Sequence, residues 1–424
     1  MSFAVLGLRA ELLKALTEQG YAKPSPIQCE AIPAILSQCD VMAVAQTGTG
    51  KTAGFALPVL QLLSAGAAVQ PLCVRALIIT PTRELAAQVA KSVENYSRYV
   101  NIRCTAAYGG MRIEPQITKL QEGVDVLVAT PGRLLDLYNQ QAFNFSQLEI
   151  LVLDEADRML DLGFVDDIRH IQSLLPNKPQ TLMFSATFSK EIKLLAQGML
   201  VNPLLLEVTA ANSTVDRVKQ LIHPVDKGRK TELLLYLINK NKWSQVLVFS
   251  RTKQGADALV LSLEKAGINA ASIHADRSQH ARTLNLDGFK DGNVKVLVAT
   301  DIAARGIDIN QLPCVINFDL PYVAQDYVHR IGRTGRADKN GLAISLFSED
   351  EAKQLQVIEG VIDRKLEREI IPGFAPRVKP SVKPSAPLAD DEDEYGNFEP
   401  DVKPQGRGHN QGRGVNSAKH KRKR

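Results

Sequence analysis

The sequence predicts an α/β protein with two domains, each built on a parallel sheet, followed by a basic tail. The chain has 424 residues, 45% of them hydrophobic, which is enough apolar material for two separate cores. Short apolar runs rich in Val, Ile and Leu recur between helical patterns. Uninterrupted apolar strands that alternate with helices are typical of parallel sheets covered on both faces. A third observation is an abrupt change of composition from Pro372 onward.

The apolar runs fall into two sets of five, which predicts one sheet for each set. The first set is Val41–Ala45, Ala76–Thr80, Val124–Thr130, Ile150–Asp154 and Thr181–Ser185. The second set is Gln245–Ser250, Ala270–Ile273, Val294–Thr300, Val315–Asp319 and Leu342–Phe347. The third run of each set reads almost identically, which favours an internal duplication, although buried parallel strands also converge on such residues by chance.

The boundaries follow from breaks in these patterns. We expect a first domain over residues 1–208 and a second over 214–371, because Thr-Ala-Ala-Asn-Ser at 209–213 interrupts the apolar pattern and predicts a linker. Residues 372–424 are dominated by Pro, Gly, Ser and charge, with eleven basic and seven acidic side chains. Such a segment buries too little apolar surface to offset its ordering entropy, so we expect it to be disordered.

Several classes of protein are disfavoured by what the sequence lacks. No stretch of about 18 apolar residues is present, so no transmembrane helix is predicted. The first residues lack the basic start and apolar run of a secretory signal. The five cysteines are scattered without a C-x-x-C pair, which indicates neither a zinc site nor a disulfide framework. We therefore expect a soluble, cytoplasmic protein without a membrane partner.

A glycine-rich loop follows the first predicted strand and precedes a helical pattern. Backbone N–H groups in such a loop and at a helix N-terminus suit phosphate oxygens. Lys51 is expected to reach the β- and γ-phosphates of ATP, and Thr52 to hold Mg²⁺. The alternative is a plain glycine-rich turn, which the strand–loop–helix context disfavours. The loop residues are Ala45, Gln46, Thr47, Gly48, Thr49, Gly50, Lys51 and Thr52.

An acidic run ends the fourth predicted strand, where Asp154 and Glu155 are followed by Ala156 and Asp157. Carboxylates at the carboxyl end of a parallel strand point into the crevice where ligands bind. Asp154 suits Mg²⁺, and Glu155 suits orientation and deprotonation of an attacking water. The alternative is a solvated acidic turn or helix N-terminus. Beside a phosphate loop, the run predicts ATP hydrolysis.

The run Asp-Glu-Ala-Asp resembles the signature of the DEAD-box RNA helicases, and further motifs of that family follow in order. The resemblance covers about residues 1–371 and is greatest to the bacterial RhlE-type branch. Besides the phosphate loop, the matching segments are Phe3, Gly20–Gln28, Pro81–Leu85, Gly109–Gly110, Thr130–Arg133, Ser185–Thr187, Val248–Thr252, Ala299–Asp308 and His329–Arg336.

The resemblance implies two RecA-like domains, with ATP and Mg²⁺ in the cleft between them. It implies that Gln28 reads the adenine edge and that Phe3 stacks on the ring, although Phe3 could instead be a core anchor. Arg333 and Arg336 resemble arginine fingers of the second domain, and Asp308 a ribose contact. Catalysis would then depend on Lys51, Asp154, Glu155 and both arginines.

RNA is the partner that the resemblance implies, held through largely sequence-independent backbone contacts. The residues that match the family's RNA contacts are Arg83, Gly110, Thr130, Arg133, Arg251, Arg282 and Thr300. Asp157, Ser185, Thr187 and His329 match the residues that couple the ATP and RNA sites. Strand-end caps and ordinary turns remain the alternatives for the threonines, Ser185 and Gly110.

One segment departs from the family pattern. Ala275 stands where the family often has a glycine, a residue that tolerates a positive φ, so the resemblance supports the RNA contacts of the second domain less firmly than it supports ATP hydrolysis. Gln279 and Arg282 keep the pattern.

The implied activity is RNA-stimulated ATP hydrolysis coupled to local unwinding, by a monomer. An ATP-gated RNA clamp that assembles other proteins and a DNA translocase are the alternative functions. The Arg-Gly and Lys-rich parts of the tail suit electrostatic binding of nucleic acid. Ribosome assembly or RNA turnover is the biological setting that the resemblance suggests.

Overall fold

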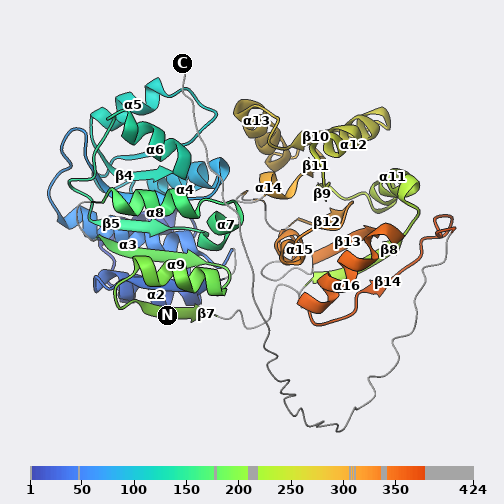
Figure 1. The fold of residues 1–424 in the computed structure, drawn as a ribbon, viewed down its shortest axis with the longest axis horizontal. Helices are drawn as coiled ribbons and strands as arrows, with labels where there is room; N and C mark the ends of the chain where they lie inside the picture. The colour runs from blue at the N-terminus through green and yellow to red at the C-terminus, as the bar shows by residue number, and fades with distance from the viewer. Residues whose placement is uncertain are drawn as a thin grey trace, which may run out of the picture. The chain divides into compact units, whose positions relative to one another are not determined.

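The computed structural model describes residues 2–45, 48–175, 179–208, 218–304, 307, 309, 312–335 and 341–377. These residues contain two seven-stranded sheets, drawn from blue to green and from yellow-green to red along the chain in Figure 1. All strand pairs in both sheets are parallel. The α/β architecture with two tandem parallel sheets is therefore confirmed. The predicted linker at 209–213 and the tail from 378 lie outside the described residues.

The first sheet has the strand order β3-β4-β2-β5-β6-β1-β7. Its central strands are buried and largely apolar, because helices cover both faces. The elements of this part of the chain are η1 (Phe3–Leu6), α1 (Ala10–Glu18), α2 (Pro26–Leu36), β1 (Val41–Ala45), α3 (Lys51–Ala65), β2 (Val74–Ile79), α4 (Arg83–Tyr96), β3 (Cys104–Ala107), α5 (Glu114–Gln121), β4 (Val124–Ala129), α6 (Pro131–Asn139), β5 (Ile150–Leu153), α7 (Ala156–Asp161), α8 (Val165–Ser173), β6 (Gln180–Ser185), α9 (Lys190–Met199) and β7 (Leu204–Val208).

Alternate residues of each strand pack on opposite faces of this sheet. On β2, Ala76 and Ile78 belong to the core cluster formed with α2, α3 and α4. Leu77 and Ile79 belong to the cluster on the other face, formed with α6, α7, α8 and α9. The sheet is therefore the middle layer of three.

The second sheet has the order β10-β11-β9-β12-β13-β8-β14. Its inner strands are buried in the same way, with Val246, Val296 and Cys314 fully buried. The elements are β8 (Val218–Pro224), η2 (Lys227–Arg229), α11 (Lys230–Asn241), β9 (Val246–Phe249), α12 (Lys253–Lys265), β10 (Ala270–Ile273), α13 (Gln279–Lys290), β11 (Val296–Ala299), α14 (Asp301–Ala304), β12 (Cys314–Asn317), α15 (Ala324–Ile331), β13 (Gly341–Phe347), η3 (Glu349–Glu351), α16 (Ala352–Val361) and β14 (Glu367–Arg368).

The second sheet also lies between two layers of helices. Helices α11 and α12 supply one core cluster, which includes Leu234 and Leu259. Phe289 of α13 and Ala303 of α14 pack on the other face, and Tyr327 of α15 packs there with Ile358 of α16 in a third cluster.

All ten predicted strands exist, and each sheet contains two strands more than expected. The missed strands are β3, β7, β8 and β14. Strand β7 lies at a sheet edge and leaves Leu204 and Leu205 half-exposed. Strand β14 has only two residues. Edge and very short strands lack the uninterrupted apolar run that marks a central strand, which explains why these two escape a search for such runs.

The packed part of the chain continues beyond Ile371, where the sequence predicted the tail to begin. Phe374 is buried in the core cluster around α11, and its ring lies 5.4 Å from that of Tyr236. The guanidinium of Arg229 lies 4.7 Å from the Phe374 ring. Residues just beyond the expected boundary at 371/372 therefore pack against the second domain.

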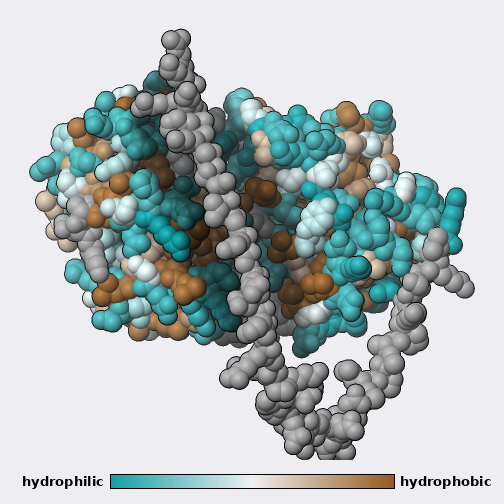
Figure 2. All heavy atoms as spheres, in the orientation of Figure 1, coloured by the Kyte–Doolittle hydropathy of each residue, from teal (hydrophilic) through white to brown (hydrophobic). Residues whose placement is uncertain are grey.

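The visible surface is mixed in character. Figure 2 shows hydrophilic side chains over most of the face in view, with smaller hydrophobic areas among them. Among the described helices, none combines the length and the apolar character needed to cross a bilayer.

Candidate nucleotide and RNA sites

The phosphate loop joins β1 to α3, as the sequence predicted. Helix α3 begins at Lys51, and Gly50 precedes it with φ 92°, a backbone conformation that favours glycine. A Cβ on Gly50 would also lie 2.4 Å from the amide nitrogen of Gln28. Both facts require glycine at this position. Gln46 and Thr47 lie outside the described residues, so their expected phosphate contacts stay predictions.

Lys51 and Asp154 are the buried charged pair of this site. The Lys51 side chain is 6% exposed, and its ammonium has no hydrogen-bond partner. Asp154 follows β5, is 3% exposed and leaves Oδ1 without a partner. Burial raises the pKa of Asp154 to about 7, and the nearby Lys51 opposes this rise. Unpaired buried charges are costly, so their presence here indicates a site shaped for a charged ligand.

Glu155 has a strained backbone and a nearly buried side chain. Its φ of 55° and ψ of 52° place it in the left-handed region, which a residue with a Cβ adopts at some cost. Its Oε2 atom lies 3.6 Å from Nε of Arg158, which is longer than a hydrogen bond, and has no hydrogen-bond partner. Arg158 is only 2% exposed and was not among the expected site residues.

Asp157 connects the acidic run to the segment Ser185–Thr187. Its Oδ2 atom accepts a hydrogen bond of 3.1 Å from the backbone N–H of Ala186, and its Oδ1 atom accepts one from the N–H of Arg158. The Ser185 hydroxyl accepts a bond of 3.3 Å from the N–H of Thr187. The expected coupling residues Asp157, Ser185 and Thr187 are therefore brought together at the ends of β5 and β6.

Gln28 binds the phosphate loop directly. Its Nε2 atom donates a hydrogen bond of 3.0 Å to the carbonyl of Gly50, and its Oε1 atom accepts one of 2.8 Å from the N–H of Ser25. The amide keeps one further hydrogen and one lone pair for a ligand. The adenine contact of Gln28 stays a prediction, with the side chain already oriented for it.

Phe3 lies in the core of the first domain. The ring is 5% exposed and meets Tyr21 edge-on at a centroid distance of 6.1 Å. Tyr21 in turn hydrogen-bonds Tyr96 through the two hydroxyls, 2.8 Å apart. The alternative expectation of a core anchor agrees with this packing, and stacking of Phe3 on adenine stays a prediction.

The expected RNA contacts of the first domain surround one loop. Gly110 has φ 81°, and a Cβ there would lie 2.3 Å from a guanidinium nitrogen of Arg83. Arg133 donates to the carbonyl of Met111, the residue after this loop, at 3.3 Å. Thr130 is the N-cap residue of α6, in extended conformation. Arg83, Thr130 and Arg133 also line one pocket.

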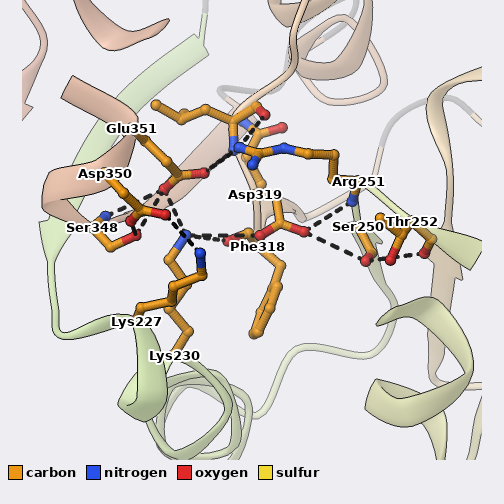
Figure 3. Close-up of polar contacts among 12 residues, drawn as sticks. Lys227, Lys230, Ser250, Arg251, Thr252, Phe318, Asp319, Ser348, Asp350 and Glu351 are labelled. Atoms are coloured by element: carbon orange, nitrogen blue, oxygen red, sulfur yellow. Dashed lines mark hydrogen bonds and ion pairs between the residues drawn. The ribbon is translucent and has the colours of Figure 1, made fainter. Parts of the chain in front are cut away.

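Arg251 follows β9 in the second domain and lies in a dense polar cluster (Figure 3). Its Nη2 atom donates to Oε1 of Glu351 at 2.8 Å, and its backbone N–H donates to Asp319 at 2.9 Å. The other oxygen of Glu351 accepts a bond of 2.6 Å from Lys230. Both Glu351 and Lys230 are 2% exposed, and neither was singled out from the sequence.

Gln279 and Arg282, which keep the family pattern, both bond Glu84 of α4. The Gln279 amide nitrogen lies 2.9 Å from Oε1 of Glu84, and Arg282 lies 2.9 Å from Oε2. Ala275 is exposed and is not one of the non-glycine residues with positive φ. The turn at Ala275 therefore does not use the left-handed region, and alanine fits this position without backbone strain.

The second domain's other expected site residues are partly described. Arg333 is 6% exposed and donates a bond of 2.6 Å to the carbonyl of Ile307. Thr300 follows β11 and its carbonyl accepts from the N–H of Ala304 in α14. His329 lies on α15. Asp308 and Arg336 lie outside the described residues, and their roles stay predictions.

Comparisons with known proteins agree with this geometry. Residues 25–195 match the DEAD/DEAH box helicase family, and residues 229–338 match the helicase conserved C-terminal domain. The chain is 41% identical to the ATP-dependent RNA helicase RhlB of Pseudomonas syringae over 376 residues, which cover 87% of this chain and 95% of that protein. It is 40% identical to the DEAD-box ATP-dependent RNA helicase RhpA of Helicobacter pylori over 372 residues, or 88% and 74% of the two chains.

The chain belongs to the DEAD-box helicase family. A solved structure of a Saccharomyces cerevisiae Dbp5 variant bound to RNA and ADP BeF3 resembles this helicase with a TM-score of 0.76 at 31% identity, covering 87% of this chain and 95% of that one. The helicase is thus an ATP-dependent enzyme that hydrolyses ATP and acts on RNA.

Sequence reasoning missed several residues that hold the helicase site together. Arg330 is 2% exposed and binds both oxygens of Asp301, at 2.5 and 2.7 Å. It also donates to Asn317 and to the carbonyl of Asp319. Arg330 stands inside the His329–Arg336 motif, and an arginine is seldom fully buried unless it is paired. The distant acidic partner, however, could not be read from the sequence.

Proposed function

We propose that this DEAD-box helicase separates short RNA duplexes locally, with ATP hydrolysis conditional on bound RNA. The observation that carries the proposal is the link from Asp157 to the backbone of Ala186. This link connects the acidic run beside the nucleotide site to the segment that the family resemblance assigns to RNA coupling. A change at either end of such a bonded pair alters the geometry at the other end.

We assign the nucleotide contacts as follows. Lys51 binds the phosphates, and its buried ammonium lacks any partner that would compete. Thr52 and Asp154 hold Mg²⁺, an ion that is bound through one or two carboxylates together with substrate phosphates and waters. The orphaned Oδ1 of Asp154 fits such a ligand set. When bound, the ion supplies charge stabilisation to the phosphoryl oxygens.

Glu155 orients and deprotonates the attacking water. Its side chain is nearly buried, it follows Asp154 in the chain, and Nε of Arg158 lies 3.6 Å from its carboxylate. Arg333 and Arg336 add positive charge to the transferring phosphoryl group when the two domains close on ATP. Asp308 contacts the ribose, and Gln28 and Phe3 contact the adenine.

RNA lies along Arg83, Gly110, Thr130 and Arg133 of the first domain. In the second domain RNA lies along Arg251, Arg282 and Thr300. Arg282 then either gives up its ion pair with Glu84 to contact RNA, or keeps this ion pair and orients a neighbouring side chain. Contacts of this kind to phosphate and sugar carry little sequence information, which agrees with a general remodelling activity. Closure on RNA and ATP together makes their binding reciprocal, so that each raises the affinity for the other.

The family branch, the oligomeric state, the cellular location and the biological setting are inferred from the sequence. We infer an RhlE-type branch, a monomeric cytoplasmic protein, and a setting in ribosome assembly or RNA turnover. An ATP-gated clamp is the second candidate. The link between Asp157 and Ala186 favours it, because such a link makes ATP binding and RNA binding depend on each other. A strand-displacement assay on a short duplex distinguishes the two, since a clamp hydrolyses slowly and displaces few strands.

The decisive test of the mechanism is Glu155→Gln. We expect this variant to bind ATP and RNA while its RNA-stimulated turnover falls by about 100-fold or more, because loss of a general base typically costs 10²–10⁴-fold. The matched control is Asp161→Asn, at the end of the same helix α7. Normal turnover by Glu155→Gln would disprove the assigned role. If DNA stimulated ATP hydrolysis as strongly as RNA does, the alternative function of a DNA translocase would be favoured instead.

A further inference from the structure

An exposed aromatic side chain lies beside Arg251 without any role in the fold core. Tyr322 is 73% exposed, in the loop between β12 and α15. The guanidinium carbon of Arg251 lies 4.7 Å from the centre of its ring. Val323, the next residue, is 51% exposed. A large ring kept in water costs hydrophobic free energy, and a ligand that covers the ring would remove this cost.

The position of this ring in the sheet relates it to the proposed RNA path. Arg282, Thr300 and Arg251 each follow one of three adjacent strands, β10, β11 and β9. The next strand in the sheet is β12, and the loop after it carries Tyr322. Thr300, Arg251 and Tyr322 therefore come after the carboxyl ends of neighbouring parallel strands, where α/β sheets bind their ligands, and Arg282 lies near the start of the helix that follows β10.

Arg251, against which the ring lies, is itself held by hydrogen bonds. Arg251 is fixed by Glu351 and by the carbonyl of Leu320 at 3.2 Å. Glu351 is fixed in turn by Lys230 and by the N–H of Leu320 at 2.9 Å. Figure 3 shows this support converging from β9, the loop after β12 and the turn at η3. A pre-oriented contact loses less entropy when a ligand binds.

The charges of this support nearly cancel. Arg251 and Lys230 are matched by Glu351 and Asp319, and the exposed Lys227 is matched by Asp350 at 2.7 Å. The Arg251 side chain is 19% exposed, so part of it stays accessible to a ligand. The cluster thus offers a nucleotide one guanidinium edge and one aromatic face, not a strong positive field.

We propose that Tyr322 is a stacking platform for one nucleobase of the bound RNA strand, with Arg251 holding the adjacent phosphate. Aromatic rings stack on every base and so add affinity without sequence preference. This inference rests on the proposed function, because it needs RNA to pass Arg251. It adds a base contact to a set of residues otherwise expected to touch phosphate and sugar.

The test measures binding of single-stranded RNA decamers to the full chain with a non-hydrolysable ATP analogue. One oligonucleotide is intact, and the others each carry one abasic site. In the wild type, one abasic position should weaken binding by about 5- to 100-fold, the range expected for one stacked base. Tyr322→Ala should weaken binding of intact RNA by the same factor and lose sensitivity at that position. Tyr322→Phe should behave as wild type.

Two controls make the result specific. Val357→Ala, an exposed side chain of α16 in the same domain, should leave every affinity unchanged. RNA-free ATP hydrolysis should be the same in Tyr322→Ala and the wild type, because the ring is not part of the nucleotide site. Equal affinities and abasic profiles for Tyr322→Ala and the wild type would overturn the stacking role alone. A wild type that does not bind RNA would overturn the proposed RNA path as well.

Discussion

At the scale of single residues, the nucleotide site contains buried charged atoms that lack hydrogen-bond partners among the described residues. Lys51 and Asp154 each leave a charged atom unsatisfied, and Glu155 adds backbone strain. Such features reduce the stability of the free protein. The phosphates and the Mg²⁺ ion that we propose for this site would offset these costs, so ligand binding is expected to stabilise the protein.

The raised pKa of Asp154 makes this cost depend on pH. The folded-state pKa of about 7 exceeds the ordinary value of 3.8, so the folded protein binds more protons between these values. The free energy of unfolding therefore falls as pH rises through this window, by about 1.4 kcal/mol for each pH unit between the two pKa values.

Asp154→Asn should remove this fall in the free energy of unfolding with rising pH. We expect the nucleotide-free variant to melt at a higher temperature than the wild type at pH 8, with a smaller difference at pH 5. Thermal unfolding at the two pH values measures the effect. Asp166→Asn, whose side chain is 90% exposed, is the control and should show no such trend. A difference between Asp154→Asn and the wild type that is equal at both pH values would contradict the assignment.

At the scale of elements, the turn at η3 supports the part of the second domain that we propose to bind RNA. Glu351 ends this turn and joins Lys230 of α11 to Arg251 after β9. One buried carboxylate therefore ties together three segments that are far apart in the sequence. Removing one partner of a buried ion pair leaves the other charge uncompensated.

Glu351→Gln should lower the free energy of unfolding by about 3–5 kcal/mol, the usual cost of breaking a buried ion pair. Asp350→Asn is the matched control on the same turn. Its partner Lys227 is 76% exposed, so about 0–1 kcal/mol is expected. Denaturant unfolding of both variants checks the ordering. Similar losses of unfolding free energy in the two variants would show that the burial of Glu351 does not determine how much its ion pairs stabilise the fold.

At the scale of the whole molecule, the folded part and the basic tail are expected to divide RNA binding between them. The folded domains are expected to supply positioned contacts, whereas the excess positive charge of the tail suits electrostatic contact with the nucleic acid. Because Phe374 packs on α11, a truncation that tests the tail has to spare it.

Deletion after Arg377 should leave RNA-free ATP hydrolysis unchanged and weaken RNA binding. It should also flatten the dependence of RNA affinity on salt, since each phosphate contact that is lost reduces the slope. Titrations at several salt concentrations measure this. Deletion after Ile371 is the informative comparison, because it removes Phe374 and should in addition lower thermal stability. An unchanged salt slope would exclude the tail from RNA binding.

The sequence by itself determined the fold class, the phosphate loop and the acidic run. Apolar strands covered on both faces leave a strong signal, and Gly50, Lys51 and Asp154 belong to local motifs whose chemistry follows from spacing. The same local view missed edge strands such as β7, whose apolar run of three leucines is interrupted by Glu207.

Only the tertiary structure decided which distant residues support these motifs. Arg330 binds Asp301, Glu351 joins Lys230 to Arg251, and Asp157 reaches Ala186. It also decided that Ala275 needs no positive φ. The physical reason is that hydrogen bonds and ion pairs between strand ends depend on sheet order, and here the order β10-β11-β9-β12 does not follow the order of the chain.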